Sequence, residues 1–382
     1  MLHAPIIWPD AVTFLAAEAP EEPVFIFAPA ALKAQARRFL DGFPGLTTYA
    51  VKANAHPQVL ATLLEAGVRA FDVASPDEIE TVLSLAPDAR LHYHNPVKSR
   101  AELAFAHRRG VRVFACDSAA ELAKMREVLP PEGVQISVRF RMPAKGAAYD
   151  FGAKFGAEPE AAARLLAEAA AAGFAPALTF HPGTQCLNPD AWRIYIEAAA
   201  RIARMAGVRL AQLNVGGGFP ARRTGDEAFA LEDYFAAIAE AARRAFGDQV
   251  PPLACEPGRA MAADCMSVAT RVKLVREDGA VFLNDGIYGA LAEAPLLGSA
   301  TRMRVLDPSG RPRRGAPRPR VVFGPTCDSV DRLPGEPALP DDLAEGDFVL
   351  FEGLGAYGMA TVTRFNGYGP TRVATVSAPR PV

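Results

Sequence analysis

TTYAVK (47–52) is the first of four short β-prone runs that decide the fold. RAFDVA (69–74), LHYH (91–94) and RVFACD (112–117) follow it, each starting 21 or 22 residues after the one before. That spacing holds one strand, two loops and one helix. A strand–helix unit that repeats in this way is typical of an α/β protein with a parallel sheet.

Four later runs share this texture: QISVRF (135–140), ALTFHP (177–182), QLNVGG (212–217) and LACEPG (253–258). The segments between them are helical in character, and residues 158–172 and 231–246 are the clearest cases, with Ala-rich or amphipathic patterns. Eight units predict a closed (β/α)8 TIM barrel, with a doubly wound open sheet as the alternative.

The texture changes after about residue 260, where Gly, Pro and Asp turns separate short β-prone runs. The strands expected here span residues 266–275, 281–283, 320–323, 348–352 and 361–365. We therefore predict a barrel over 24–261 and an all-β domain over 262–382 that also includes residues 1–23. The stretch SGRPRRGAPRP (309–319) could bind an anion, but a solvated connection is the stronger expectation.

Composition sets several classes of protein aside. The 382 residues are 50% hydrophobic and 22% charged, and 41 Lys+Arg against 43 Asp+Glu leave a net charge of −2. This balance argues against a nucleic-acid or membrane partner held by bulk charge. No apolar run reaches the roughly 18 residues needed to span a bilayer. The N-terminal residues do not show the pattern of a signal peptide, and the five cysteines are an odd number without paired spacing. We therefore expect a cytoplasmic protein.

The ends of the predicted strands carry reactive side chains. Lys52, one of only seven lysines, ends the first strand. It is either a structural cation or an amine desolvated for Schiff-base chemistry. His181 follows the sixth strand and Glu256 the eighth. His181 alone could be an ordinary core histidine, but the carboxyl ends of barrel strands meet at one mouth.

A phosphate site is expected beside them. Three consecutive glycines, Gly216, Gly217 and Gly218, let backbone N–H groups converge on an anion, and Gly258-Arg259 adds a guanidinium. No dinucleotide or P-loop motif is present. An amine, a phosphate cradle, an imidazole and a carboxylate together fit pyridoxal 5'-phosphate. No metal is predicted, and His92 and His94 are interpreted as packing or substrate-channel residues.

The motifs resemble those of one family, the fold-type III pyridoxal-phosphate-dependent decarboxylases of ornithine, lysine, arginine and diaminopimelate. The resemblance implies an alanine-racemase-like barrel with a β domain, and a homodimer with two shared active sites. The matching motifs are YAVKAN (49–54), FDVASPDEIE (71–80), KFG (154–156), FHPGTQC (180–186), NVGGGFP (214–220), EPGR (256–259), NDGIYG (284–289), GPTCDSVD (324–331) and GAYGMATVTRFNGY (355–368).

The resemblance also implies roles around the cofactor. Lys52 is the Schiff-base lysine, His181 stacks on the ring and Glu256 pairs with the ring nitrogen. Asp72, Glu78 and Arg139 surround the cofactor. The residues implied to bind its phosphate are Thr184, Gly216, Gly217, Gly218, Gly258, Arg259 and Tyr357.

Other implied residues act across the dimer. Cys327 reaches the partner's site near the Cα proton, and Asp328 lies near the substrate's distal amine. Tyr288 and Glu293 are further substrate-binding candidates. Lys154 and Asp331 are implied to form an ion pair between subunits.

Within this family the Cys-Asp of GPTCDSVD favours the ornithine/lysine branch. The run ALAEAPLLGS (290–299) lacks a Tyr-Asp pair that ornithine decarboxylases of the eukaryotic type use for the distal amine, and Pro182 is a second departure. We predict decarboxylation of ornithine, lysine or a close diamino acid to a polyamine-type amine. The alternatives are a meso-diaminopimelate decarboxylase and a non-catalytic regulatory homologue that binds the cofactor. A racemase is less expected, because alanine racemases carry an Arg in place of Glu256.

Overall fold

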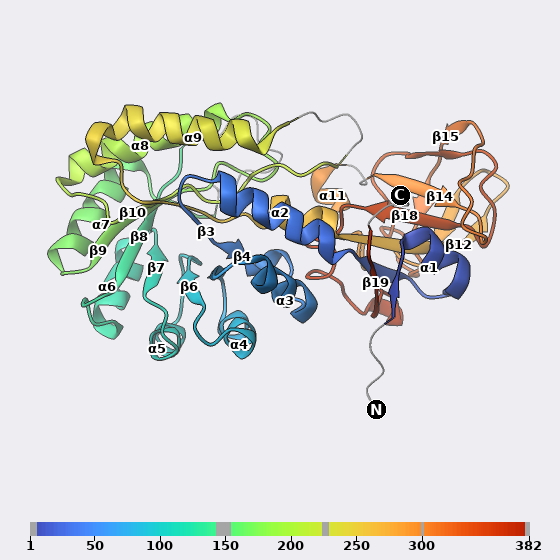
Figure 1. The fold of residues 1–382 in the computed structure, drawn as a ribbon, viewed down its shortest axis with the longest axis horizontal. Helices are drawn as coiled ribbons and strands as arrows, with labels where there is room; N and C mark the ends of the chain where they lie inside the picture. The colour runs from blue at the N-terminus through green and yellow to red at the C-terminus, as the bar shows by residue number, and fades with distance from the viewer. Residues whose placement is uncertain (1–5, 143–153, 224–228, 299–301, 379–382) are drawn as a thin grey trace. The chain divides into compact units, whose positions relative to one another are not determined.

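A computed structural model describes residues 6–142, 154–223, 229–298 and 302–378. Contacts within the chain divide it into two compact units (Figure 1). The first, called here the barrel unit, comprises Ala36–Pro220 and Ala228–Ala260. The second, the β unit, comprises Met1–Gln35, Ala221–Glu227 and Met261–Val382. None of the helices in the described ranges is long and apolar enough to cross a bilayer.

Parallel strands form the centre of the barrel unit. In the described part of the chain nine segments pair in the order β3-β11-β10-β9-β8-β7-β6-β5-β4. Their bounds are β3 (Leu46–Thr47), β4 (Tyr49–Ala50), β5 (Ala70–Val73), β6 (Arg90–Tyr93), β7 (Val113–Cys116), β8 (Gln135–Arg139), β9 (Ala175–Thr179), β10 (Gln212–Asn214) and β11 (Leu253–Cys255).

The first and last strands close the barrel. β3 pairs with β11 and β4 pairs with β5. Between them the Thr48 N–H donates to the Cys255 carbonyl at 2.9 Å, and the Ala50 N–H donates to the Pro257 carbonyl at 3.2 Å. β3 and β4 are therefore one strand interrupted at Thr48, and eight strand positions surround the barrel. The predicted (β/α)8 barrel is confirmed.

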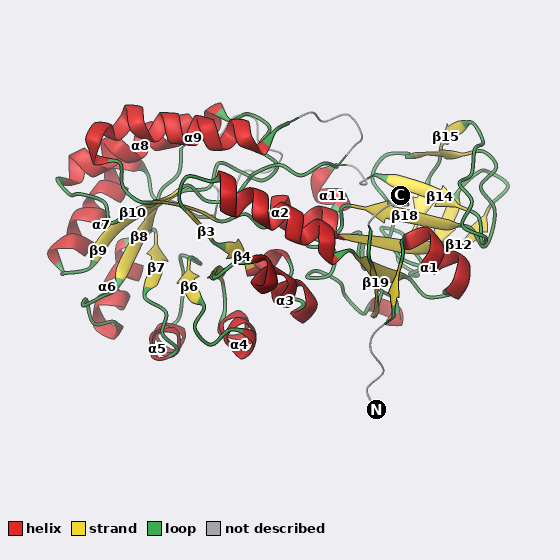
Figure 2. Cartoon of the chain, in the orientation of Figure 1, coloured by secondary structure: helices red, strands yellow, loops and turns green. Residues whose placement is uncertain are grey.

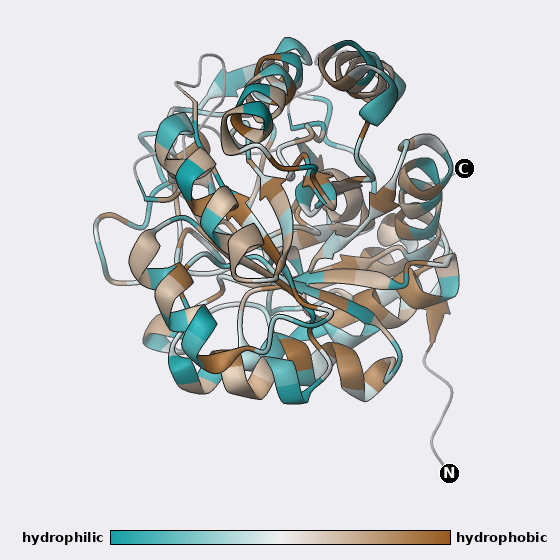
Figure 3. Cartoon of the chain, turned by 90° about the vertical axis from the view of Figure 1, so that its left-hand side faces the viewer, coloured by the Kyte–Doolittle hydropathy of each residue, from teal (hydrophilic) through white to brown (hydrophobic). Residues whose placement is uncertain are grey.

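Helices follow the strands and cover their outer faces (Figure 2). In Figure 3 these helices carry both teal and brown residues, as expected of elements with one face toward a core and one toward water. In α8, for example, Trp192, Ile196, Ala199 and Ile202 are all buried. The bounds are α2 (Pro29–Gly42), α3 (Pro57–Ala66), α4 (Pro76–Leu85), α5 (Arg100–Arg108), α6 (Ala119–Val128), α7 (Pro159–Ala171), α8 (Asp190–Ala206), α9 (Leu231–Phe246) and α10 (Arg259–Ala262).

Three successive helices begin with the same cap. Ser75, Ser99 and Ser118 each accept a hydrogen bond from the backbone N–H three residues on, at the start of α4, α5 and α6. A serine in this position satisfies an N–H that the helix leaves unpaired. The residue three positions after each serine is a glutamate, and these short caps fix where each strand end gives way to a helix at the barrel mouth.

The β unit is built mainly on a mixed sheet of eight strands within the described residues. β12 is its long central strand and pairs antiparallel with β2, β13 and β18. The bounds are β1 (Ile7–Trp8), α1 (Ala11–Glu18), β2 (Val24–Phe27), β12 (Met266–Val275), β13 (Val281–Leu283), α11 (Ala294–Leu297), β14 (Met303–Leu306), β15 (Pro317–Pro319), β16 (Val322–Phe323), β17 (Ala338–Pro340), β18 (Phe348–Glu352) and β19 (Arg372–Val376).

Two expectations for this unit are wrong. Residues 361–365 form no strand, because the Thr361 N–H and hydroxyl both bond the Tyr357 carbonyl four residues earlier, which makes a turn. The segment 309–319 is not merely a solvated connection. Arg313 forms a two-bonded ion pair with the buried Asp347, and β15 pairs with β17.

The N-terminal residues contribute to the β unit beyond the limit we expected. β2 is hydrogen-bonded between β12 and β19. The division by contacts therefore begins the barrel unit at Ala36, whereas the prediction begins it at residue 24. The predicted domain limits remain a proposal.

Candidate active site

A cavity of about 220 Å³ opens at the carboxyl ends of the barrel strands. This is the end at which (β/α)8 enzymes place their chemistry. Five of the predicted site residues share its wall, although they come from five different strand ends. The lining residues are Lys52, Asp72, Ala74, His94, Asn95, Pro96, Arg139, Lys154, Phe155, Thr179, Phe180, His181 and Glu256.

Lys52 enters this cavity from a single 3₁₀ turn, Val51–Ala53, that follows β4. Its two neighbours in the turn are buried, whereas Lys52 is exposed. The sequence suggested an amine desolvated at the end of a buried strand, and in the single chain it is not buried. Its positive charge instead acts on the carboxylates of Asp72, Glu78 and Glu256.

Glu256, directly after β11, is a carboxylate of the cavity wall that accepts two side-chain hydrogen bonds. His94 Nδ1 bonds its Oε1, and Asn214 Nδ2 donates to the same oxygen at 2.5 Å. Burial alone would raise the pKa of Glu256, but His94, Lys52 and His181 outweigh burial and hold the pKa well below its usual range. Glu256 is therefore an anion at neutral pH.

Asp72, in β5, behaves differently from Glu256. Burial and the charge of Glu256 raise the pKa of Asp72 to about 7. Its Oδ1 is buried and has no hydrogen-bond partner among the described residues, and it lies 3.7 Å from His94 Nδ1. The two carboxylates thus favour different protonation states, as expected when like charges share a buried site.

Asp72, His94 and Glu256 also place one donor atom each within 4.8 Å of one another. Such a trio can hold a metal ion. Here His94 and Glu256 are bonded directly to each other, so the arrangement is that of a hydrogen-bonded pair. We assign no metal to it, and the expectation of a metal-free protein stays a prediction.

His181 lies just after β9, and a backbone N–H determines that its Nδ1 is a hydrogen-bond acceptor. The Gly183 N–H donates to His181 Nδ1 at 3.1 Å, so this nitrogen carries a lone pair. Burial, together with the Arg139 and Lys52 charges, lowers the pKa of His181 to about 3. A neutral imidazole at this place offers an uncharged face rather than an ion-pair partner.

The glycine loop after β10 packs against two neighbouring strand ends. Gly216 has φ +69°, and a Cβ placed there would lie 2.1 Å from the Phe180 carbonyl oxygen. A Cβ on Gly218 would lie 2.3 Å from the Gly183 carbonyl oxygen. Only glycine fits this close approach of backbone to backbone. Thr184 follows Gly183, so the predicted phosphate residues of two loops are neighbours.

Gly258 and Arg259 complete this side of the mouth. A Cβ on Gly258 would meet the Ala53 side chain at 2.9 Å, beside Lys52. Arg259 begins α10 and is 8% exposed. A buried guanidinium next to glycine backbone is suited to a phosphate group.

The β unit holds a second group of predicted residues. The Tyr288 hydroxyl donates to Asp328 Oδ2 at 2.5 Å, and the Val330 N–H donates to Asp328 Oδ1 at 3.0 Å. The Tyr288 hydrogen bond lowers the pKa of Asp328. Cys327, the exposed cysteine among the five, lies beside the Asn366 side chain, with Sγ 3.4 Å from Oδ1.

Other predicted residues of this unit are placed as follows. Tyr357 has φ +63°, and Glu293 precedes α11. Asp331 is 1% exposed and accepts hydrogen bonds from the Ile287 and Thr326 N–H groups. Its predicted ion pair with Lys154, and the meeting of these residues with the barrel mouth, remain predictions.

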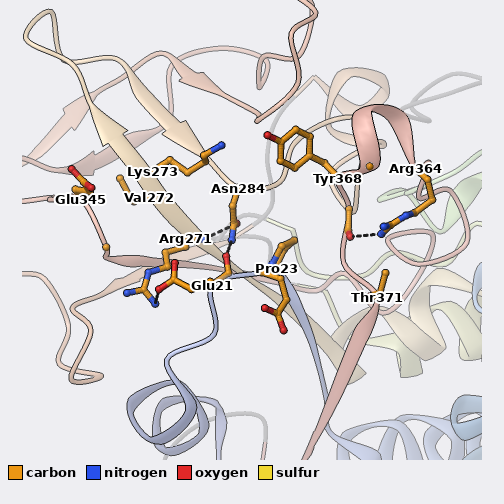
Figure 4. A pocket seen from close by; sticks show the side chains of 14 residues that line it. Glu21, Pro23, Arg271, Val272, Lys273, Asn284, Glu345, Arg364, Tyr368 and Thr371 are labelled. Carbon is orange, nitrogen blue, oxygen red and sulfur yellow. Dashed lines mark hydrogen bonds and ion pairs between the residues drawn. The ribbon is translucent and has the colours of Figure 1, made fainter.

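A larger cavity of about 720 Å³ lies within the β unit (Figure 4). Its basic side chains contact other residues of its own wall. Arg271 lies 3.4 Å from the Glu21 carboxylate, and Arg364 donates to the Gly369 carbonyl at 2.9 Å. Lys273 lies over the Tyr368 ring at 5.2 Å. We place the chemistry in the barrel cavity, where convergent acids, bases and an amine meet.

Comparison with known proteins identifies the class. Residues 30–263 match the family model described as "Pyridoxal-dependent decarboxylase, pyridoxal binding domain". A lysine/ornithine decarboxylase of Selenomonas ruminantium is 33% identical over 330 residues, which cover 84% of this chain and 80% of that protein. The chain belongs to the pyridoxal-dependent decarboxylase family, as the sequence motifs predicted.

Solved structures of decarboxylases are similar to this chain in fold. A Vibrio vulnificus lysine/ornithine decarboxylase complexed with cadaverine superposes with a TM-score of 0.82 at 28% identity, covering 97% of this chain and all of that one. The arginine decarboxylase of Paramecium bursaria Chlorella virus gives 0.84 at 28% identity, covering 95% and 98%. The protein is an amino-acid decarboxylase, and pyridoxal phosphate is its cofactor.

The residues present fit this cofactor. Glu256 is an anion that accepts from His94 and Asn214 on Oε1, so Oε2 would be the oxygen that accepts from a protonated ring nitrogen. The Gly216–Gly218 backbone and Arg259 suit the phosphate, and the neutral His181 suits the ring face. Lys52 brings the amine that an aldehyde requires. These roles are proposals drawn from the geometry and the resemblance.

Sequence reasoning missed two residues, His94 and Asn214. The sequence predicts His94 as a packing or substrate-channel residue, and it gives Asn214 only as part of the glycine motif. His94 follows β6 directly, so its position at a strand end is the signal that could have indicated it. Asn214 needed the structure, because its contacts join residues 42 and 120 positions away in sequence.

Proposed function

We propose that this protein removes the α-carboxylate of a basic L-amino acid, ornithine and/or lysine or a close diamino acid, and releases CO2 and the diamine. The similarity to lysine/ornithine decarboxylases supports this substrate class. Two of the similar Vibrio vulnificus structures hold cadaverine and putrescine, which are diamines with a cationic group at each end.

The residues of the barrel mouth have complementary tasks. Bound pyridoxal phosphate supplies an electron-withdrawing ring joined to the substrate's amine. Lys52 would hold the cofactor through its aldehyde carbon. Glu256 would accept the hydrogen bond of the ring nitrogen and keep its proton in place. His181 would cover the ring and limit access of water.

The fixed carboxylate of Asp328 is the observation that supports a substrate with a second cationic group. Tyr288 and Val330 hold both of its oxygens, and the Tyr288 hydrogen bond favours the ionised form. A fixed anion is the complement of an ammonium group at the far end of a diamino acid. Ordinary amino acids without that second cation would leave the carboxylate without a cationic partner and bind more weakly.

We propose further that the protein works as a homodimer with shared sites. In this arrangement Cys327 and Asp328 of one subunit serve the barrel mouth of its partner. Cys327 Sγ then returns a proton to Cα after CO2 leaves, directly or through a water that it positions. The proposal draws on the resemblance and on the exposure of Cys327 in the single chain.

The test is a substrate profile of the purified holoenzyme. Release of CO2 is measured for ornithine, lysine, arginine and meso-diaminopimelate. The proposal expects ornithine or lysine to give the highest kcat/KM. A preference for meso-diaminopimelate or arginine would replace the substrate assignment, and cofactor binding without CO2 from any of them would favour the regulatory alternative.

Asp328→Asn gives the matched test of the distal contact. Losing a charged hydrogen-bond partner should raise KM for the preferred diamino acid roughly tenfold to a hundredfold. Asp278→Asn is the control, because Asp278 pairs with Arg276 in an exposed turn of the same unit. Equal KM values for Asp328→Asn and the wild type would refute the role of Asp328.

A further inference from the structure

His94 occupies a place that the implied cofactor chemistry leaves unassigned. It follows β6 and is 6% exposed, with Nδ1 on Glu256 Oε1. Glu256 follows β11, so the contact crosses the barrel between residues 162 positions apart. A histidine that touches the carboxylate proposed for the ring nitrogen can change what that carboxylate does.

The direction of each hydrogen bond follows from the neighbouring groups. The Gly216 N–H donates to Asn214 Oδ1 at 2.8 Å, so the amide NH2 of Asn214 faces Glu256. An ionised carboxylate only accepts hydrogen bonds, so His94 Nδ1 must carry a proton. The 3.2 Å approach of Asn214 Nδ2 to His94 Nδ1 then joins two donors and is not a hydrogen bond. Oε1 of Glu256 receives both donors.

The charges around His94 support this arrangement. Burial alone would lower the pKa of His94, but Glu256 and Asp72 raise it above its ordinary value, against the opposing charge of Lys98. Its strand neighbour His92 lies with its ring 5.3 Å away, and burial lowers the pKa of His92 well below normal. Lys52 and His181 also act electrostatically on Glu256 and lower its pKa. His94 is thus the histidine of this pair that is set to donate to Glu256.

We propose that His94 is a positioning residue for Glu256: by donating to Oε1 it keeps the carboxylate ionised and turned toward the cofactor, so that the proton shared with the ring nitrogen stays on the nitrogen. A carboxylate relieved of these donors is a stronger base and draws that proton toward itself. The ring then withdraws electrons less strongly, and the developing negative charge at Cα is less stabilised.

This inference rests on the proposed pairing of Glu256 with the ring nitrogen. It also differs from a purely structural role, in which His94 would only fill space at the end of β6. The two readings separate when the donor is removed while the volume is kept. Leu at position 94 fills space without a donor, whereas Asn places an amide N–H at the same distance along the side chain as Nδ1.

The experiment uses holoenzyme loaded with pyridoxal phosphate labelled with ¹⁵N in its ring, and measures the ¹⁵N chemical shift, which distinguishes a protonated from an unprotonated ring nitrogen. The wild type and His94→Asn should give the protonated shift, and His94→Leu should move toward the unprotonated one. His92→Leu is the control, since it alters the adjacent buried histidine without removing the Glu256 bond, and its shift should match the wild type.

Kinetics provide the second readout. His94→Leu should lower kcat roughly tenfold to a hundredfold with KM unchanged, the loss of one hydrogen bond to a charged group, and His94→Asn should recover most of it. Where His94→Leu does not fold, His94→Ala is the donor-free variant. A wild-type shift in the donor-free variant overturns the inference. An unprotonated ring nitrogen in active wild type overturns the Glu256 pairing, and inactive wild type overturns the proposed function.

Discussion

Replacing Lys98 by Met should destabilise the barrel by about 2–4 kcal/mol. Lys98 is 1% exposed, and its Nζ donates to the Asn95 carbonyl at 2.7 Å and to the Ala115 carbonyl at 2.6 Å. It also lies 3.2 Å from Glu121 Oε1. Met fills a similar volume, so the change removes the ammonium with little change in packing.

The magnitude follows from what each partner loses. The buried Ala115 carbonyl and the part-buried Asn95 carbonyl lose their donor, at about 1–3 kcal/mol each, and burying the ammonium no longer costs desolvation energy. Glu121 is not left alone, because Lys124 Nζ remains 2.5 Å from its Oε2. The lost carbonyl hydrogen bonds therefore dominate, and the cost stays below that of a fully uncompensated buried charge.

Urea unfolding of the apoprotein measures this cost, with the m-value checking that both proteins unfold in the same way. Lys124→Met is the control, because Lys124 contacts the same carboxylate from a less buried position and should cost at most about 1 kcal/mol. Asn95 and Pro96 line the cofactor cavity, so Lys98→Met should also weaken cofactor binding. A cost below about 1 kcal/mol, or an equal cost for both variants, would refute this reasoning.

Two further changes test the structure. Asp285 is 1% exposed, and burial raises its pKa to about 7. Between its ordinary pKa of 3.8 and about pH 7 the folded protein therefore keeps a proton on Asp285 that the unfolded chain releases. The free energy of unfolding consequently falls as the pH rises from about 4 to 7. In Asp285→Asn the unfolding free energy should fall less over this range, by about 1–3 kcal/mol, when urea unfolding is compared at pH 4 and 8; identical pH profiles would contradict this. Gly216→Ala should cost more than about 3 kcal/mol and weaken phosphate binding, because its Cβ meets the Phe180 carbonyl oxygen. Gly207→Ala, with a similar φ of +65° and nothing within 4 Å, should cost only about 1–2 kcal/mol, and equal costs for the two would show that the close contact is not decisive.

Much of the fold could be predicted because parallel barrels repeat one unit. The strand runs lie near their expected places, and 266–275, 281–283 and 348–352 match β12, β13 and β18. Residues 361–365 have β-prone composition but bond within a turn, a local competition that composition does not reveal. The pairing of β2 with β12 joins residues more than 230 apart, so no local pattern could assign it.

The candidate site was predictable where it depended on strand ends. Lys52, His181 and Glu256 could be placed at one mouth because parallel strands bring their carboxyl ends together. The role of His94 could not be predicted, since it depends on which side chains meet across the closed barrel. The exposure of Lys52 was also unexpected, because a strand-end position does not specify how the following turn directs its side chain.

The lysine to which the cofactor is attached can be identified by trapping the bond chemically. Holoenzyme is reduced with borohydride, digested, and analysed by mass spectrometry for a pyridoxyl group on lysine. Within the described residues two lysines line the barrel cavity, Lys52 and Lys154. We predict the label on Lys52 and its loss in Lys52→Ala. A label on Lys154 or on another lysine, or no covalent label in active enzyme, would contradict it.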